Sequence, residues 1–171
     1  MVYKGDRPPP TSAQLEQLRR ERAAFVPVVR AWAESVPHVR RVWLFGSFVH
    51  ERHARHDLDV AVELVGWPEG EPASFWAFAP WARELERLLG GAVEVDMRHY
   101  AGETLHVVRD GLAADEPSEV ARGVREHGLV VFDGRRRQGS AEQVAELRAF
   151  IAAGEQADPG FKPRMLDDIL A

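Results

Sequence analysis

The segment LFGSFVHERHARHDLDVAVEL, residues 44–64, carries the features that bear most directly on the fold of this chain. Its first apolar residues end at Gly46-Ser47, which predicts a buried strand that enters a tight turn. Nine residues later, Asp57 and Asp59 open a second apolar run, which predicts another strand. Because successive side chains of a strand point to opposite faces, Asp57 and Asp59 are expected to share one face. The segment therefore predicts paired carboxylates close to a glycine-containing turn.

The chemistry of this pattern points to a divalent cation and a phosphate group. Two carboxylates this close repel each other unless a cation lies between them. Ligation by oxygen alone, with few protein ligands, suits Mg²⁺, which also binds the phosphate oxygens of a substrate. Gly46 permits a close approach of the backbone to a phosphate. Ser47 offers a hydroxyl and an N–H at the start of a predicted short helix, residues 48–54.

A two-metal site also needs a third carboxylate. The candidate is Asp96, which lies in the strand-like segment VEVDM at residues 93–97. Glu94 shares a face with Asp96 and stays an alternative. His99 and Tyr100 follow Asp96 closely, so they are either contacts for a second substrate or ordinary loop residues.

Periodicity and capping residues predict helices and strands along the rest of the chain. A long helix begins at Thr11, with Gln14 as its capping-box partner, and Pro27 is expected to break or kink it. Ser140 opens a final helix that Gly154 is expected to end. The other predicted elements are strands at residues 41–45, 58–65, 92–97 and 129–132 and helices at about 80–90 and 118–127. Residues 100–117 give no definite prediction.

The composition is that of one ordinary globular domain. The chain has 171 residues, of which 45% are hydrophobic and 29% are charged. It has no cysteine, which excludes disulfides, Cys-ligated zinc, iron–sulfur clusters and thiol nucleophiles. No apolar run approaches the roughly 18 residues of a membrane span, and the first residues lack a hydrophobic signal core. We therefore expect a cytoplasmic protein that does not bind membranes.

The net charge of −5 is unevenly distributed. Residues 1–60 hold ten Lys and Arg against seven Asp and Glu, whereas residues 61–171 hold twelve against twenty. The acidic second part argues against long nucleic acid as a partner. A small anionic ligand held by a local basic patch is compatible with this distribution.

Residues 42–96 resemble the DNA polymerase β-like nucleotidyltransferase superfamily, and most closely its minimal nucleotidyltransferase (MNT) branch. The family signature is a hydrophobic strand, a Gly-Ser pair, an Asp-x-Asp strand after a short spacer and a later Asp on a third strand. The matching residues here are Gly46, Ser47, Asp57, Asp59 and Asp96.

The resemblance implies the nucleotidyltransferase fold, an α/β (α+β) fold with a small mixed β-sheet and flanking helices. We expect an N-terminal arm at residues 1–10 and a nucleotidyltransferase domain at residues 11–134. A linker, a C-terminal helix and a tail would then occupy residues 135–171.

The resemblance also implies an enzyme that transfers a nucleoside monophosphate from a nucleoside triphosphate (NTP), such as ATP, to an acceptor hydroxyl, with pyrophosphate leaving. Asp57, Asp59 and Asp96 would be the catalytic and metal-binding residues and would hold two Mg²⁺ ions. Asp96 would either bind one ion or take the proton of the hydroxyl. Gly46 and Ser47 would bind the nucleotide.

The segment after the Gly-Ser pair departs from the family pattern. Many small members have Arg-x-Arg-Gly there, where the arginines can hold the triphosphate, but this chain has FVHE at residues 48–51. Arg52 and Arg55 are the predicted nucleotide-binding substitutes, and His50, His53 and His56 are further candidates. The alternative function is therefore a catalytically weak module of the same fold that binds nucleotide or a partner.

The acceptor is left open between two classes. Small members of this group modify either a small molecule such as an antibiotic or a protein partner such as a cognate toxin. A small helical protein of the HEPN type is the expected partner in the second case. This toxin–antitoxin hypothesis fits a short chain without a separate acceptor-binding domain.

Overall fold

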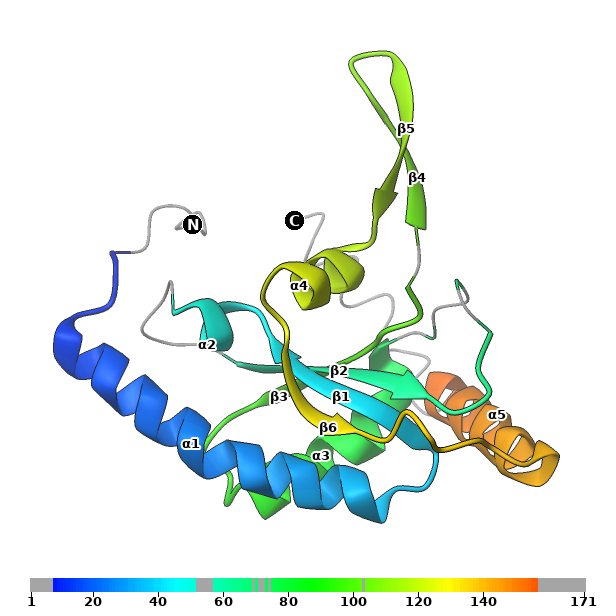
Figure 1. The fold of residues 1–171 in the computed structure, drawn as a ribbon, viewed down its shortest axis with the longest axis horizontal. Helices are drawn as coiled ribbons and strands as arrows, with labels where there is room; N and C mark the ends of the chain where they lie inside the picture. Colours follow the sequence, from blue (N-terminus) through cyan, green and yellow to red (C-terminus); the bar gives the residue numbers. More distant parts are fainter. Residues whose placement is uncertain are drawn as a thin grey trace.

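A mixed four-stranded sheet lies at the centre of the folded molecule, with the strand order β3-β2-β1-β6 (Figure 1). The computed structural model describes residues 8–51, 57–68, 70, 73, 75–102 and 104–156. Strand β1 (Val39–Phe45) is antiparallel to β2 (Leu58–Leu64) and to β6 (Leu129–Asp133), whereas β3 (Val95–His99) is parallel to β2. The expected class, an α+β fold with a small mixed sheet flanked by helices, is confirmed.

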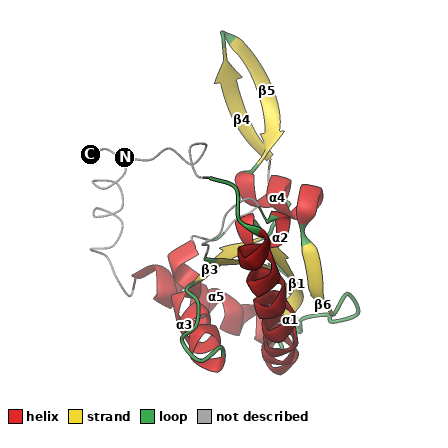
Figure 2. Cartoon of the chain, turned by 90° about the vertical axis from the view of Figure 1, so that its left-hand side faces the viewer, coloured by secondary structure: helices red, strands yellow, loops and turns green. Residues whose placement is uncertain are grey.

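One face of the sheet packs against three helices, α1 (Ser12–Ser35), α3 (Ala79–Leu88) and α5 (Ala141–Gln156). Figure 2 shows these helices on one side of the sheet and α4 on the other. The main core contains a stripe of α1 residues and the alternate residues of β1 and β2 that point to the same side. Its α1 members are Leu18, Phe25, Val29, Trp32 and Ala33. Burial of this stripe, with the helical period that the sequence shows, holds α1 against the sheet.

The opposite face of the sheet is covered by α4 (Glu119–His127). A smaller core forms there from Trp43, Phe45, Ala61 and Val124. Gly123 allows α4 to approach closely, since a Cβ at this position would lie 2.9 Å from Cδ2 of Phe45. The sheet therefore has one face that the main core covers, with His99 of β3 as a buried polar residue, and one face that is apolar in the middle and polar at its ends.

The predicted helix caps are confirmed. The Thr11 hydroxyl accepts from the Gln14 backbone N–H (3.2 Å), and the Gln14 side chain accepts from the Thr11 N–H (2.8 Å). Ser118 caps α4 by accepting from the Ala121 N–H at 3.1 Å. Local side-chain chemistry thus fixes where these helices begin.

A break of α1 at Pro27 and an end of the last helix at Gly154 are not found. Helix α1 runs from Ser12 to Ser35 without a break at Pro27. Its apolar stripe continues on both sides of the proline, so core packing offsets the lost backbone hydrogen bond. Helix α5 continues past Gly154 to Gln156. Gly154 is a site of close approach, because a Cβ there would lie 2.4 Å from the Ala77 carbonyl oxygen.

A two-stranded hairpin lies within residues 100–117, the region without a definite prediction. Strands β4 (Thr104–Arg109) and β5 (Leu112–Pro117) project from the body of the molecule (Figure 1). Asp110 and Gly111 form the two-residue turn, with φ of 52° and 76°. Positive φ at both positions is what a type I′ hairpin turn requires, and Asp-Gly is a preferred pair for it.

The segment after β6 is attached to the body of the protein. The Arg137 guanidinium donates hydrogen bonds to the carbonyl oxygens of Val36 (2.8 Å), Val39 (3.0 Å) and Glu34 (2.9 Å). On α5, Leu147 and Ile151 are buried in the main core. The boundary at residue 134 stays a prediction.

Within the described part of the chain, no helix combines the length and the apolar character needed to cross a lipid bilayer.

Candidate active site

The structure brings the predicted carboxylates to one end of the sheet. Strand β1 ends where β2 and β3 begin, and Asp59 is in register with Phe45 on one side and with Asp96 on the other. In β2 and β3 the two aspartates alternate with buried residues of the main core, so both face the side of α4. Asp57 directly precedes β2 and is exposed. Gly46 directly follows β1.

Glu94 is less well placed than Asp96. It is exposed and precedes β3, and its carbonyl oxygen accepts from the Leu58 N–H at 2.8 Å. Asp96 lies inside β3, directly beside Asp59. The register therefore favours Asp96 as the third carboxylate.

Gly46 fits closely against Asp59. Its φ is +73°, and a Cβ on it would lie 2.1 Å from Oδ2 of Asp59. Any other residue would clash with the carboxylate and would adopt an unfavourable backbone conformation. The glycine thus allows the turn and the Asp59 carboxylate to occupy the same small region.

The Gly46 backbone also starts helix α2 (Ser47–His50) and contacts α4. Its carbonyl oxygen accepts from the N–H groups of Val49 (3.0 Å) and His50 (3.2 Å). Its N–H donates to Nε2 of His127 at 3.0 Å. Nε2 is therefore the acceptor nitrogen, and the neutral His127 ring carries its proton on Nδ1.

Sequence reasoning missed His127, which ends α4. Its ring packs edge-on against the His50 ring, with centroids 4.7 Å apart. The residue joins the end of α4 to the turn that contacts Asp59. No local signal in the sequence indicates this contact, because Gly46 and His127 are 81 positions apart.

Arg98 is a second residue that the sequence analysis missed. Its Nε donates to Oδ1 of Asp96 at 2.8 Å, and its Nη2 donates to Oδ2 at 3.0 Å. Burial lowers the pKa of Arg98, but the hydrogen bonds and charge of Asp96, with further charge from Asp59 and Glu119, raise it overall. The signal was present, since residues 96 and 98 share a face of a strand.

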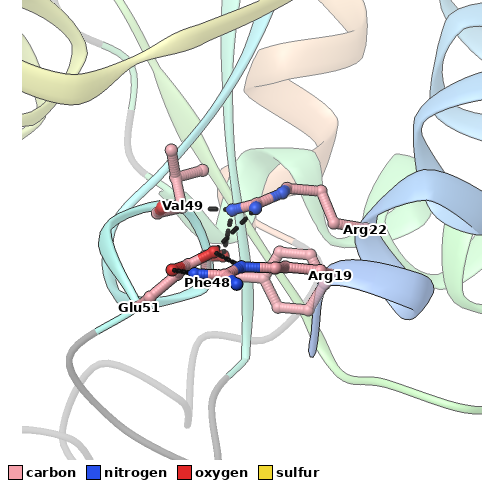
Figure 3. Close-up of polar contacts among 5 residues, drawn as sticks. All are labelled: Arg19, Arg22, Phe48, Val49 and Glu51. Carbon is pink, nitrogen blue, oxygen red and sulfur yellow. Dashed lines mark hydrogen bonds and ion pairs between the residues drawn. The ribbon is translucent and has the colours of Figure 1, made fainter. Parts of the chain in front are cut away.

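Helix α2 is fixed by two arginines from α1 (Figure 3). Arg19 binds both carboxylate oxygens of Glu51, at 2.9 and 2.8 Å, and Nη2 of Arg22 binds Oε1 of Glu51 at 2.8 Å. Nη1 of Arg22 donates to the carbonyl oxygens of Phe48 (3.3 Å) and Val49 (3.1 Å). The hydrogen bonds and charges of both arginines lower the pKa of Glu51 to about 2.

The position after Ser47, where the family pattern has an arginine, belongs to the core in this chain. Phe48 is buried and stacks on Phe25, with ring centroids 5.9 Å apart and an interplanar angle of 15°. Its side chain is therefore directed into the protein. The predicted substitutes Arg52 and Arg55 lie outside the described residues, as do His53 and His56.

The donor set suits a hard cation such as Mg²⁺. Asp59 and Asp96 are adjacent in register and face one side, and Asp57 lies two residues before Asp59. Carboxylate oxygens are the ligands that Mg²⁺ prefers. Among the described residues, however, no three metal-binding side chains converge closely enough to hold an ion as they lie. The guanidinium of Arg98, a cation of this chain, is what Asp96 binds here.

Comparisons with known proteins yield no family assignment. No protein-family model matches the chain, and no curated protein matches it significantly. One similar solved structure is a crystal structure of a toxin–antitoxin with AMP-PNP. The two sequences are 16% identical, the match covers 85% of this chain and 98% of that chain, and the TM-score is 0.41. Another is a mutant of the toxin–antitoxin MntA-HpeT. Its sequence is 15% identical, the match covers 87% of this chain and 98% of that chain, and the TM-score is 0.40. We therefore argue function from the residues of the site.

Proposed function

We propose that this protein is a Mg²⁺-dependent nucleotidyltransferase that moves a nucleoside monophosphate from an NTP to an acceptor hydroxyl. The observation that carries the proposal is the register of Asp59 beside Asp96, with Gly46 packed against the Asp59 carboxylate. Asp57 lies two residues before Asp59, which is one repeat of a β-strand, so it would add a third carboxylate to Asp59 and Asp96. Three carboxylates at the end of a sheet, next to a Gly-Ser turn, form a donor set suited to transfer of a phosphoryl group.

In the proposed reaction the acceptor oxygen attacks the α-phosphorus of the NTP. A new P–O bond forms, the bond to the β-phosphate oxygen breaks, and pyrophosphate leaves with the electron pair. Asp57, Asp59 and Asp96 would hold two Mg²⁺ ions, which supply charge stabilisation for the phosphate oxygens. Asp96 would either bind one of these ions or accept the proton of the acceptor hydroxyl.

Binding of the nucleotide is assigned to residues around the turn. We propose that Ser47 contributes its hydroxyl, that Gly46 keeps the turn close to Asp59, and that Arg52 and Arg55 neutralise the triphosphate. Arg98 neutralises Asp96 before the nucleotide arrives, since two of its nitrogens donate hydrogen bonds to that carboxylate. The acceptor is proposed to be a protein hydroxyl, such as one on a cognate HEPN-type toxin, or a hydroxyl of a small molecule.

The test is transfer of label from α-labelled NTP in the presence of Mg²⁺ and cell lysate, with each of the four NTPs in turn. Wild-type protein is expected to give a labelled product, and the variant Asp57→Ala with Asp59→Ala is expected to give none. Asp110→Asn is the matched control, because Asp110 lies in the hairpin turn at a positive φ that asparagine also adopts. Equal transfer by the double variant and the control would overturn the proposal.

A second candidate is a catalytically weak module that binds nucleotide or a partner. Two observations favour it. Phe48 is buried where the family pattern has an arginine, and Asp96 is engaged by Arg98. Calorimetry distinguishes the two functions, because tight binding of Mg²⁺–NTP without release of pyrophosphate would identify the binding module.

A further inference from the structure

A cavity of about 340 Å³ lies at the far end of the sheet from the carboxylates. It is formed where β1 begins, where β2 and β3 end, and by one residue of α4. The polar and aromatic residues that matter here are Arg40, Arg41, Glu63, Trp67, Tyr100 and Arg125.

The cavity lies on the same face of the sheet as the proposed active site but is separate from it. Glu63 and Tyr100 are each four residues beyond Asp59 and Asp96, which corresponds to about 13 Å along a strand. On this face of the sheet, Ala61 of the small core under α4 lies between Asp59 and Glu63, and Arg98 lies between Asp96 and Tyr100. A ligand in the cavity would therefore not occupy the position between the aspartates.

Among the described residues that line the cavity, positive side chains outnumber negative ones. Three of these residues are arginines, and Glu63 is the one described carboxylate beside them. That carboxylate is already engaged, since Nη2 of Arg41 donates to its Oε1 at 3.1 Å and Nε of Arg41 donates to its Oε2. Within the described part of the chain, Arg40 and Arg125 form no ion pair. The cavity thus holds two positive charges that no described carboxylate neutralises.

The Arg40 guanidinium is only partly hydrogen-bonded. Its Nη2 donates to the carbonyl oxygen of Arg135 at 3.2 Å, and its buried Nε has no hydrogen-bond partner among the described residues. Because Nε is closed to solvent, a ligand in the cavity would not reach it, and Arg40 contributes to the cavity through its charge.

Two aromatic rings, those of Trp67 and Tyr100, form part of the cavity wall. The Trp67 ring lies below the Arg148 guanidinium, 4.8 Å from the ring centroid. The Tyr100 ring packs edge-on against Trp43, with centroids 4.7 Å apart. The volume is several times that of a phosphate ion and falls at the lower end of the roughly 300–1,000 Å³ found for small-molecule sites. An anion attached to a compact organic group would fit this volume and these residues.

We propose that this cavity binds the phosphate monoester of a small molecule. A phosphate monoester carries about −1.5 to −2 charges near neutral pH, which matches the two uncompensated arginines better than one carboxylate does. A guanidinium group can donate two parallel hydrogen bonds to the oxygens of one phosphate. The rings of Trp67 and Tyr100 can pack against the organic group. This inference does not depend on the proposed nucleotidyl transfer.

The test is calorimetric titration of the full chain with phenyl phosphate, inorganic phosphate and benzoate, in buffer with EDTA. Phenyl phosphate is expected to bind at one saturable site, more tightly than inorganic phosphate, which lacks the ring, and than benzoate, which carries one charge. Arg125→Gln is expected to weaken binding of phenyl phosphate about tenfold, because it removes a positive charge and a hydrogen-bond donor from the cavity. Arg125→Lys should retain part of the affinity.

Two controls make the result specific. Arg87→Gln removes an exposed arginine of α3 that does not line the cavity, and it should leave the affinity unchanged. Asp59→Asn removes a carboxylate of the proposed active site and should not weaken binding. The proposal is overturned if wild-type protein shows no saturable binding, if Arg87→Gln weakens binding as much as Arg125→Gln, or if Asp59→Asn abolishes it. Benzoate binding as tightly as phenyl phosphate would overturn the preference for phosphate.

Discussion

At the scale of single residues, the close contact between Gly46 and Asp59 links the shape of the turn to the chemistry of the site. The sequence identified both residues, but for different reasons. We expected Gly46 to make room for a phosphate, whereas in the structure it makes room for a carboxylate. The turn and the aspartate therefore depend on each other.

Gly46→Ala is predicted to destabilise the protein and to weaken metal binding. A positive φ costs a non-glycine residue about 1–2 kcal/mol. The Cβ would also displace the Asp59 carboxylate. Gly90→Ala is the matched control, because Gly90 has a similar φ of +71° and nothing within 4 Å of the added Cβ. Denaturant unfolding should give a larger loss for Gly46→Ala, and equal losses would show that the Asp59 contact is unimportant.

Arg98 is predicted to compete with a divalent cation for Asp96. Its guanidinium binds both oxygens of that carboxylate, so a metal ion must displace it. Arg98→Gln should therefore bind Mn²⁺ about tenfold more tightly than wild type, which corresponds to about 1.4 kcal/mol. The variant should also be less stable without metal, because Asp59 and Asp96 then repel each other.

The measurement for Arg98 is a Mn²⁺ titration followed by electron paramagnetic resonance, together with thermal unfolding with and without Mn²⁺. The Mn²⁺ affinity of Arg98→Lys should fall between those of Arg98→Gln and wild type, because lysine keeps the charge but cannot donate two parallel hydrogen bonds to one carboxylate. An unchanged or lower Mn²⁺ affinity in Arg98→Gln would rule out the competition.

At the scale of elements, α2 is a short helix whose position depends on its partners. The ion pairs of Glu51 with Arg19 and Arg22 connect its end to α1 (Figure 3). A four-residue helix has no independent stability. These contacts therefore help to define where the Gly-Ser turn lies.

The Glu51 contacts predict a specific pH dependence. The pKa of Glu51 is lowered from 4.5 to about 2 in the folded protein. The stability that it contributes is therefore present above about pH 4.5 and is lost as the pH falls toward 2. Glu51→Gln should be less stable than wild type at pH 7, and the difference should shrink between pH 5 and pH 2.

Denaturant unfolding at several pH values measures this difference. Glu84→Gln, at an exposed position of α3, is the control for loss of a carboxylate and should differ little from wild type at any pH. A stability difference between wild type and Glu51→Gln that stayed constant down to pH 2 would contradict the assignment.

The elements also show how far sequence reasoning reaches. Capping boxes and apolar stripes predicted the helices well, because those signals are local. The third strand was expected at residues 92–97 but runs from Val95 to His99, since pairing with β2 decides its limits. The hairpin carried a usable signal in Asp110-Gly111. The contact of His127 with Gly46 carried none, because tertiary packing alone brings α4 to the turn.

At the scale of the whole molecule, the sheet presents two polar sites on one face. The carboxylates lie where β2 and β3 begin, and the arginine-lined cavity lies where they end. Between them α4 covers an apolar patch that includes Trp43 and Ala61. The net charge of −5 does not reveal this arrangement, in which Asp59 and Asp96 lie at one end of the surface and Arg40, Arg41 and Arg125 lie at the other.

The central claim is that Asp59 and Asp96 are ligands of one divalent-metal site. Its most direct test is the Mn²⁺ affinity of Asp59→Asn compared with that of wild type and of Asp110→Asn. We predict that wild type and Asp110→Asn bind Mn²⁺ equally and that Asp59→Asn binds it at least about tenfold more weakly, a loss of about 1.4 kcal/mol or more. Equal Mn²⁺ affinity in all three proteins would contradict the claim.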